Sequence, residues 1–199
     1  MTSTLAFLRL LLIALLLAPF AGSARAQSEE EGIRALLEQR DTEIKVLLSS
    51  GEMAADQRAT LKEVINGIID FEALGKTALG SHWEGLSASQ QAEYVEVFSD
   101  IVKRQSVADL DVYRSSVTYD NVSVDGTTAR VLTTTTINEV ATPVVYAMHE
   151  VNGAWLITDI VIKDVSTADG YARSFQSLIR KRGFDTLMEK LRARRDTSA

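Results

Sequence analysis

The residue types that most often carry out chemistry in proteins are scarce in this chain. It contains no cysteine and only two histidines, His82 and His149, among 199 residues. Neither histidine has a second metal-binding side chain at the short spacing that zinc sites use. Without cysteine there is no thiol nucleophile, thiolate ligand or disulfide. The sequence therefore predicts no catalytic residue, no bound metal and no cofactor.

One carboxylate stands apart because it interrupts an apolar run. Asp159 lies between hydrophobic residues of a predicted strand, where it could be the general base of a small-molecule isomerase or dehydratase. Tyr146 and Tyr171 are the nearby candidates for its partner in such an enzyme. The alternative, which we favour, is a buried carboxylate that accepts hydrogen bonds from a loop or a helix end.

Apolar residues at three- and four-residue spacing predict a helical region over residues 28–110. Gly51 ends the first helix, and Asp56 can cap the second. Ser87 and Gln90 have the spacing of a capping box, which begins a long third helix. That third helix is apolar on two sides, so we expect other elements to surround it.

The hydrophobic period changes to two over residues 113–163, which indicates a sheet. The predicted strands are Val117–Val124, Ala129–Ile137, Val144–Val151 opened by Pro143, and Ala154–Lys163. Asp125-Gly126 and Asn152-Gly153 are hairpin signals, so the strands form an antiparallel meander. Helical spacing returns over 167–195 with a break at Gly183, and the whole order predicts an α+β fold.

The first 26 residues have the pattern of a secretory signal peptide. Arg9 precedes the apolar run Leu10–Ala18, and Ala24-Arg25-Ala26 is a cleavage site of the A-x-A type. We expect a mature chain that starts near Gln27, forms a single domain over 27–199 and resides in the periplasm. Losing Arg9 and Arg25 changes the formal net charge from −6 to about −8, which argues against nucleic-acid binding.

Several short motifs resemble the toluene-tolerance, or MlaC-type, family of periplasmic phospholipid-binding proteins. The matching residues are Asp70-Phe71, Leu79-Gly80, Trp83, Ser87, Gln90, Tyr94, Phe98, Trp155, Asp159, Val165-Ser166, Tyr171, Phe175, Gly183-Phe184 and Leu187. Two departures occur: Asp164 replaces a glycine of the family pattern, and Ala172 separates Tyr171 from the arginine that usually follows it directly.

The resemblance implies a curled antiparallel sheet of four to five strands, of nuclear-transport-factor-like type, cradled by helices around an apolar cavity. It further implies a phospholipid ligand that is shuttled between an outer-membrane lipoprotein complex and an inner-membrane ABC transporter complex, which maintains outer-membrane lipid asymmetry. Only transient membrane contact is expected. A hopanoid-associated branch of the same family, which would carry another lipid, fits the same framework.

Acyl chains explain why a cavity would suit such a carrier. One sixteen-carbon chain costs roughly 12 kcal/mol in water, and two chains need a cavity on the order of 900 Å³. The predicted lipid-binding residues are Phe98, Val102, Val131, Val145, Ala147, Trp155, Ile157, Phe175 and Ile179. A shift of one residue would reverse the strand faces, and Thr134 is placed on the face opposite Val145. A solid core would instead indicate an interaction protein.

Overall fold

A computed structural model describes residues 20–49, 53–108, 110–137 and 139–197 of the chain. The apolar run Leu10–Ala18 lies outside the described residues. The predicted cleavage site at Ala26 lies within the first helix, α1 (Phe20–Leu48). No helix among the described residues is both long and apolar enough to span a bilayer.

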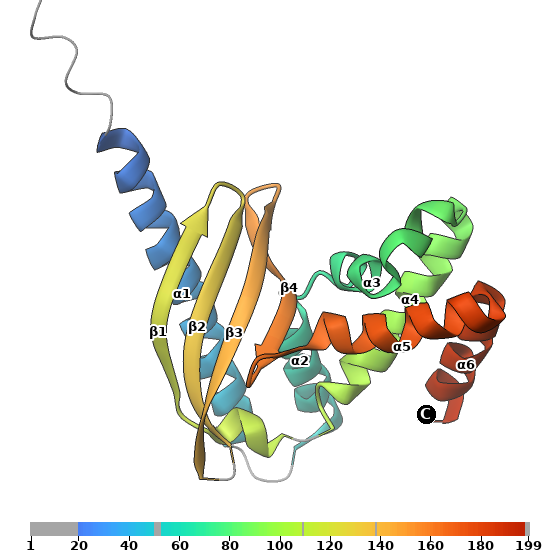
Figure 1. Cartoon of the computed structure of the whole chain (residues 1–199). Coiled ribbons are helices and arrows are strands. Elements are labelled where there is room, and N and C mark those ends of the chain that lie inside the picture. The colour runs from blue at the N-terminus through green and yellow to red at the C-terminus, as the bar shows by residue number, and fades with distance from the viewer. Residues whose placement is uncertain (1–19, 50–52, 109, 138, 198–199) are drawn as a thin grey trace, which may run out of the picture.

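Five antiparallel strands form one open sheet in the order β1-β2-β3-β4-β5 (Figure 1). They are β1 (Val117–Asp125), β2 (Thr128–Ile137), β3 (Val140–Val151), β4 (Ala154–Ile162) and β5 (Val165–Ser166). Gly126 and Gly153 adopt φ angles of 59° and 82° in the two predicted hairpin turns, a left-handed region that glycine enters without strain. The predicted α+β meander is thus confirmed.

Two details of the sheet differ from the sequence expectation. β3 begins at Val140 rather than after Pro143, and the Pro143 carbonyl accepts a hydrogen bond from the Lys163 amide. The β4–β5 turn places Lys163 and Asp164 at φ angles of 50° and 63°. Asp164 stands where the family pattern has glycine, in a left-handed conformation that aspartate tolerates better than most residues.

The helices lie on the concave side of the sheet and beyond its β4 edge. α1 runs along the sheet, while α3 (Phe71–Leu79), α4 (Ala88–Gln105), α5 (Thr167–Arg182) and α6 (Phe184–Thr197) gather past β4 (Figure 1). α2 (Ala55–Asn66) packs against α1. Two short 3-10 helices, η1 (Gly80–Gly85) and η2 (Asp111–Arg114), complete the connections.

Local signals explain most helix ends. The Ser87 hydroxyl accepts from the Gln90 amide, and the Gln90 side chain accepts from the Ser87 amide at 2.9 Å, so the capping box is confirmed. Gly183 ends α5 with a φ of 84°. The expected cap Asp56 is wrong: Ala54 is the N-cap of α2, and Asp56 lies in the first turn, where its charge favours the helix dipole.

Three buried clusters hold these elements together, and a cavity separates them. One lies among α3–α6 and contains Trp83, Tyr94, Phe98 and Phe175. A second joins α1 to the sheet through residues such as Ile33 and Val131, and a third joins α1 to α2.

Candidate binding cavity

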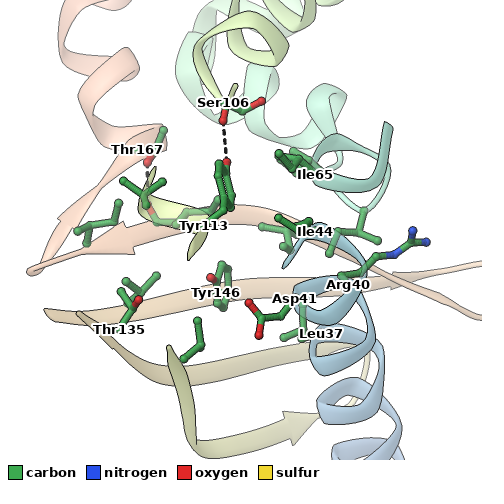
Figure 2. Close-up of a pocket in the computed structure, with 18 of the residues that line it drawn as sticks. Leu37, Arg40, Asp41, Ile44, Ile65, Ser106, Tyr113, Thr135, Tyr146 and Thr167 are labelled. Carbon is green, nitrogen blue, oxygen red and sulfur yellow. Dashed lines mark hydrogen bonds between the residues drawn. The ribbon is translucent and has the colours of Figure 1, made fainter. Parts of the chain in front are cut away.

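A cavity of about 480 Å³ lies between the concave face of the sheet and the helices (Figure 2). One side of the cavity is formed by α1 and α2. Another side is formed by the end of α4, by η2 and by the start of α5. The sheet contributes residues from all four long strands. Its lining is mostly aliphatic and aromatic: Leu37, Ile44, Val64, Ile65, Ile68, Ile69, Val102, Val112, Tyr113, Val117, Tyr119, Ile137, Val144, Tyr146, Ile157, Ile160, Ile162 and Tyr171. This volume lies within the usual range of ligand pockets.

Strand alternation and a bulge decide which sheet residues reach the cavity. Val144 and Tyr146 face it from β3, and they pair with Ile162 and Ile160 of β4. The register then shifts by one residue in β4, so Ile157 also faces the cavity although it lies three positions from Ile160. β4 therefore contributes three isoleucines to one wall.

Two of the residues predicted to bind lipid line this cavity, and the other seven lie elsewhere. Val102 and Ile157 are in the lining. Phe98, Phe175 and Ile179 belong to the core among α3–α6, where Phe98 is fully buried. Helix periodicity marked these side chains as apolar, but it carries no information on whether a neighbouring helix or a cavity receives them.

The strand residues divide according to face. Val131 and Trp155 lie on the concave side, packed in the core between α1 and the sheet. Val145 and Ala147 alternate with the lining residues Val144 and Tyr146 and therefore point to the opposite face. Leu132 pairs directly with Val145 and therefore shares its face. Thr134 lies two residues after Leu132 in β2, so it points to that same outer face. The expectation that Thr134 and Val145 lie on opposite faces is therefore corrected.

Sequence reasoning missed the contributions of α1, η2 and β1. Leu37 and Ile44 of α1 line the cavity, as do Val112 of η2 and Tyr119 of β1. The apolar stripe of α1 was visible in the sequence. Its position over the sheet, however, depends on contacts between α1 and β1 that are far apart in the chain.

The polar side chains of the lining are Arg40, Asp41, Gln105, Ser106, Thr135 and Thr167, together with the hydroxyl groups of its tyrosines. Burial raises the pKa of Tyr119 and of Tyr146, and the negative charge of Asp41 raises both pKa values further. Asp41 also lines the cavity and accepts from Lys45 Nζ at 2.7 Å; Figure 2 shows it pointing toward Tyr146. Burial raises the pKa of Tyr113 to about 12, and its hydroxyl donates to the Ser106 carbonyl at 2.8 Å. These phenols stay neutral at physiological pH.

The lining residues that are exposed show where the cavity opens. Gln105 at the end of α4, Val112 of η2 and Ile162 at the end of β4 are all exposed. At this mouth the Tyr171 hydroxyl donates to Gln105 Oε1 at 2.8 Å, which links α5 to α4. The deeper lining residues Leu37 and Ile157 are buried.

Asp159 lies outside the cavity lining and holds a helix in place. Its Oδ1 accepts from the amides of Ile160 and Ala168 at 2.8 and 2.9 Å, and its Oδ2 accepts from the Ser166 hydroxyl at 2.6 Å. The carboxylate thus ties the start of α5 to β4, as the favoured alternative expected. The proposed general base does not face the cavity.

His149 contacts a carboxylate that caps a helix, and this arrangement indicates a structural role for both side chains. His149 Nε2 lies 2.8 Å from Asp70 Oδ2, and Asp70 Oδ1 accepts from the Ala73 amide at the start of α3. Within the described ranges, no three histidine or carboxylate side chains are grouped so that they could hold a metal ion.

Comparisons with known proteins agree with this architecture. No curated protein sequence matches the chain. A solved structure, the phospholipid-binding protein from Ralstonia solanacearum in complex with a phospholipid, is similar with a TM-score of 0.69 and 21% identity, over 84% of this chain and 97% of that one. The profile of the family described as "MlaC protein" matches residues 38–193. The chain therefore belongs to the MlaC protein family.

Proposed function

We propose that this protein is a periplasmic phospholipid carrier that holds acyl chains in the cavity and moves lipid between the outer and inner membranes. The observation that supports the proposal most directly is the cavity of about 480 Å³, whose lining is mostly apolar and includes two ionisable side chains, Arg40 and Asp41. Membership in the MlaC family and the phospholipid bound to the similar Ralstonia protein support the same ligand class.

The physical argument concerns the acyl chains rather than the headgroup. A sixteen-carbon chain costs roughly 12 kcal/mol when it is exposed to water, so a carrier must replace that water with apolar side chains. Ile157, Ile160 and Ile162 on β4 and Leu37 and Ile44 on α1 supply such contacts from opposite walls. The headgroup can remain hydrated at the mouth, so no catalytic residue is needed.

The route of the lipid is inferred from the family resemblance and the signal-peptide pattern. No ATP is available in the periplasm, so the direction of transport must come from the partners, an inner-membrane ABC transporter complex and an outer-membrane lipoprotein complex. N-terminal sequencing of the protein from the periplasmic fraction should find Gln27 as the first residue. Protein in that fraction that still begins at Met1 would contradict the predicted cleavage of a signal peptide.

Two neighbouring valines give a matched test of the cavity. Val144 lines the cavity and Val145 points away from it. A carboxylate placed in the cavity is desolvated without a partner, so Val144→Glu should abolish lipid co-purification, whereas Val145→Glu should retain it. Native mass spectrometry of protein purified from a Gram-negative periplasm measures the bound lipid, and its mass distinguishes a phospholipid from a hopanoid.

Val144→Glu could lose lipid because it unfolds, so a second variant tests the cavity without adding a charge. Val102→Trp fills part of the cavity without adding charge, and Val102 is only half-buried. We expect reduced lipid occupancy at nearly unchanged thermal stability. Full lipid occupancy in folded Val144→Glu and Val102→Trp proteins would refute the cavity as the lipid site.

A further inference from the structure

Charge is distributed unevenly between the two ends of this acidic chain. Helices α5 and α6 together, residues 167–197, contain eight basic and four acidic residues, a formal charge of +4. Residues 27–166 contain 11 basic and 23 acidic residues, a formal charge of −12. α5 and α6 lie beyond the β4 edge of the sheet, away from α1 (Figure 1). A basic end therefore stands apart from an acidic body.

Helix α5 presents three of its cations on one exposed side. We define the basic face as the exposed side chains of Arg173, Arg180 and Lys181. Spacings of seven and eight residues place these side chains on the same side of a helix, and Ser174 and Ser177 lie between them on that side. The other sides of α5 pack against α3 and α6. The basic face therefore points to solvent.

No acidic side chain in the described residues pairs with the basic face. Its three cations form no ion pair there, and residues 170–182 include no aspartate or glutamate. On α6, in contrast, Arg192 pairs with Glu93 and Arg195 pairs with Asp196. The positive charge that α5 exposes is thus not neutralised within the described part of the molecule.

Helix stability alone does not explain the basic face. Cations in the last turn of a helix favour its dipole, and Arg180 and Lys181 lie in that turn of α5. Arg173 lies in the middle of the helix, where the effect of the dipole is small. α5 also begins at the cavity, because Thr167 and Tyr171 line it. The same helix therefore connects the cavity with the basic end of the molecule.

We propose that the basic face of α5 binds a bilayer surface that contains anionic phospholipid. This inference rests on the proposed function, which requires the protein to reach a membrane. The three cations are spread over about two helical turns, a spacing that phosphates moving laterally within a leaflet can match. A protein partner would instead need carboxylates fixed at that spacing.

The negative charge of the rest of the chain does not prevent this contact. At physiological ionic strength, charges that are more than about 8 Å from the surface are largely screened. Each lysine or arginine close to an anionic leaflet strengthens binding to it. The orientation with α5 toward the membrane and α1 away from it is therefore the favoured one.

Co-sedimentation of the mature protein with vesicles tests the proposal. One set of vesicles contains phosphatidylcholine alone, and the other contains phosphatidylcholine and phosphatidylglycerol at a molar ratio of about two to one. The wild type should bind only the anionic vesicles, and this binding should weaken as salt is added. Arg173→Gln/Arg180→Gln/Lys181→Gln should lower the partition coefficient for the anionic vesicles about tenfold.

The matched control is Arg58→Gln/Arg130→Gln/Lys163→Gln, which removes three exposed cations from other parts of the chain and changes the net charge equally. It should bind the anionic vesicles as the wild type does. Equal losses in the two triple variants overturn the proposal, because net charge would then explain the binding. Wild-type protein that binds both kinds of vesicle equally, or neither, also overturns it.

The lipid that each protein carries separates this proposal from the proposed function. Native mass spectrometry should find the same lipid occupancy in the basic-face variant as in the wild type. Reduced occupancy in that variant overturns the proposal, because the basic face would then help to hold the cargo. Wild-type protein that carries no lipid contradicts the proposed function itself, whatever the vesicles show.

Discussion

Single aromatic residues hold the helices of this protein together next to the cavity. Tyr94 and Phe98 of α4 are fully buried and stack with ring centroids 5.5 Å apart. Phe175 of α5 meets the Phe98 ring edge-on at 5.9 Å, and the Tyr94 hydroxyl donates to the Gly75 carbonyl of α3 at 3.2 Å. This cluster therefore fixes α3, α4 and α5 relative to one another.

Replacing Phe98 by alanine should be costly for stability and neutral for the ligand. Because the ring is fully buried among aromatic neighbours, we expect Phe98→Ala to lower the free energy of unfolding by about 3–5 kcal/mol. Chemical denaturation measures that loss, and the lipid content of the remaining folded protein should stay at the wild-type level. A loss below about 1 kcal/mol would contradict the core position of Phe98.

Helix α5 shows how one element depends on its two ends. Ser166 caps its start, with the Asp169 amide donating to the Ser166 hydroxyl at 3.0 Å. Its end is Gly183, with φ and ψ angles of 84° and 165°, a region that other residues enter only with strain. The position of Tyr171 and Thr167 at the cavity therefore depends on local signals outside the cavity.

Two glycines of this region should respond to alanine with opposite signs. Gly183→Ala should lower the free energy of unfolding by roughly 1–3 kcal/mol, because alanine must adopt a positive φ there. Gly170→Ala should raise it by about 0.4–1 kcal/mol, because this glycine lies inside α5 and the space that a Cβ atom would take is open. Thermal or urea melts of the two variants provide the comparison, and equal signs would contradict the assigned end of α5.

The tyrosines of the whole molecule are buried or half-buried, and this affects stability as a function of pH. Five tyrosines occur in the chain, and burial is the main cause that raises the pKa of each, to about 12 for Tyr113. In the unfolded chain these phenols ionise near pH 10. Between these values the folded state binds more protons than the unfolded state.

The contribution of the tyrosines to stability should therefore be fully present below pH 10 and should fall as pH rises from about 10 to 12. The slope is at most about 1.4 kcal/mol per pH unit for a largely buried tyrosine such as Tyr113, and it is smaller for the more exposed Tyr119 and Tyr171. Urea denaturation at pH 8, 10 and 11 measures it. Tyr113→Phe removes one ionisable group from the comparison and should give a shallower decline. A stability that remains flat through pH 11 would show that the phenols are not buried.

Much of the architecture followed from interactions between residues that are close in the chain. The capping box of Ser87 and Gln90, the hairpin glycines and the stop at Gly183 act within a few residues, so short motifs predicted these ends correctly. Asp159 was also interpreted correctly as a helix-end acceptor. Family motifs contributed the curled sheet and the cavity as expectations.

Short sequence motifs could not predict which residues line the cavity. An apolar pattern marks Phe98 and Val102 alike, although one packs against aromatic rings and the other lines the cavity. In β3, the choice between Val144 and Val145 depends on which face of the sheet the helices cover, and a register shift in β4 adds Ile157 to the residues that face the cavity. Burial against a side chain and burial against a ligand remove the same apolar surface from water, so residue patterns alone do not separate them.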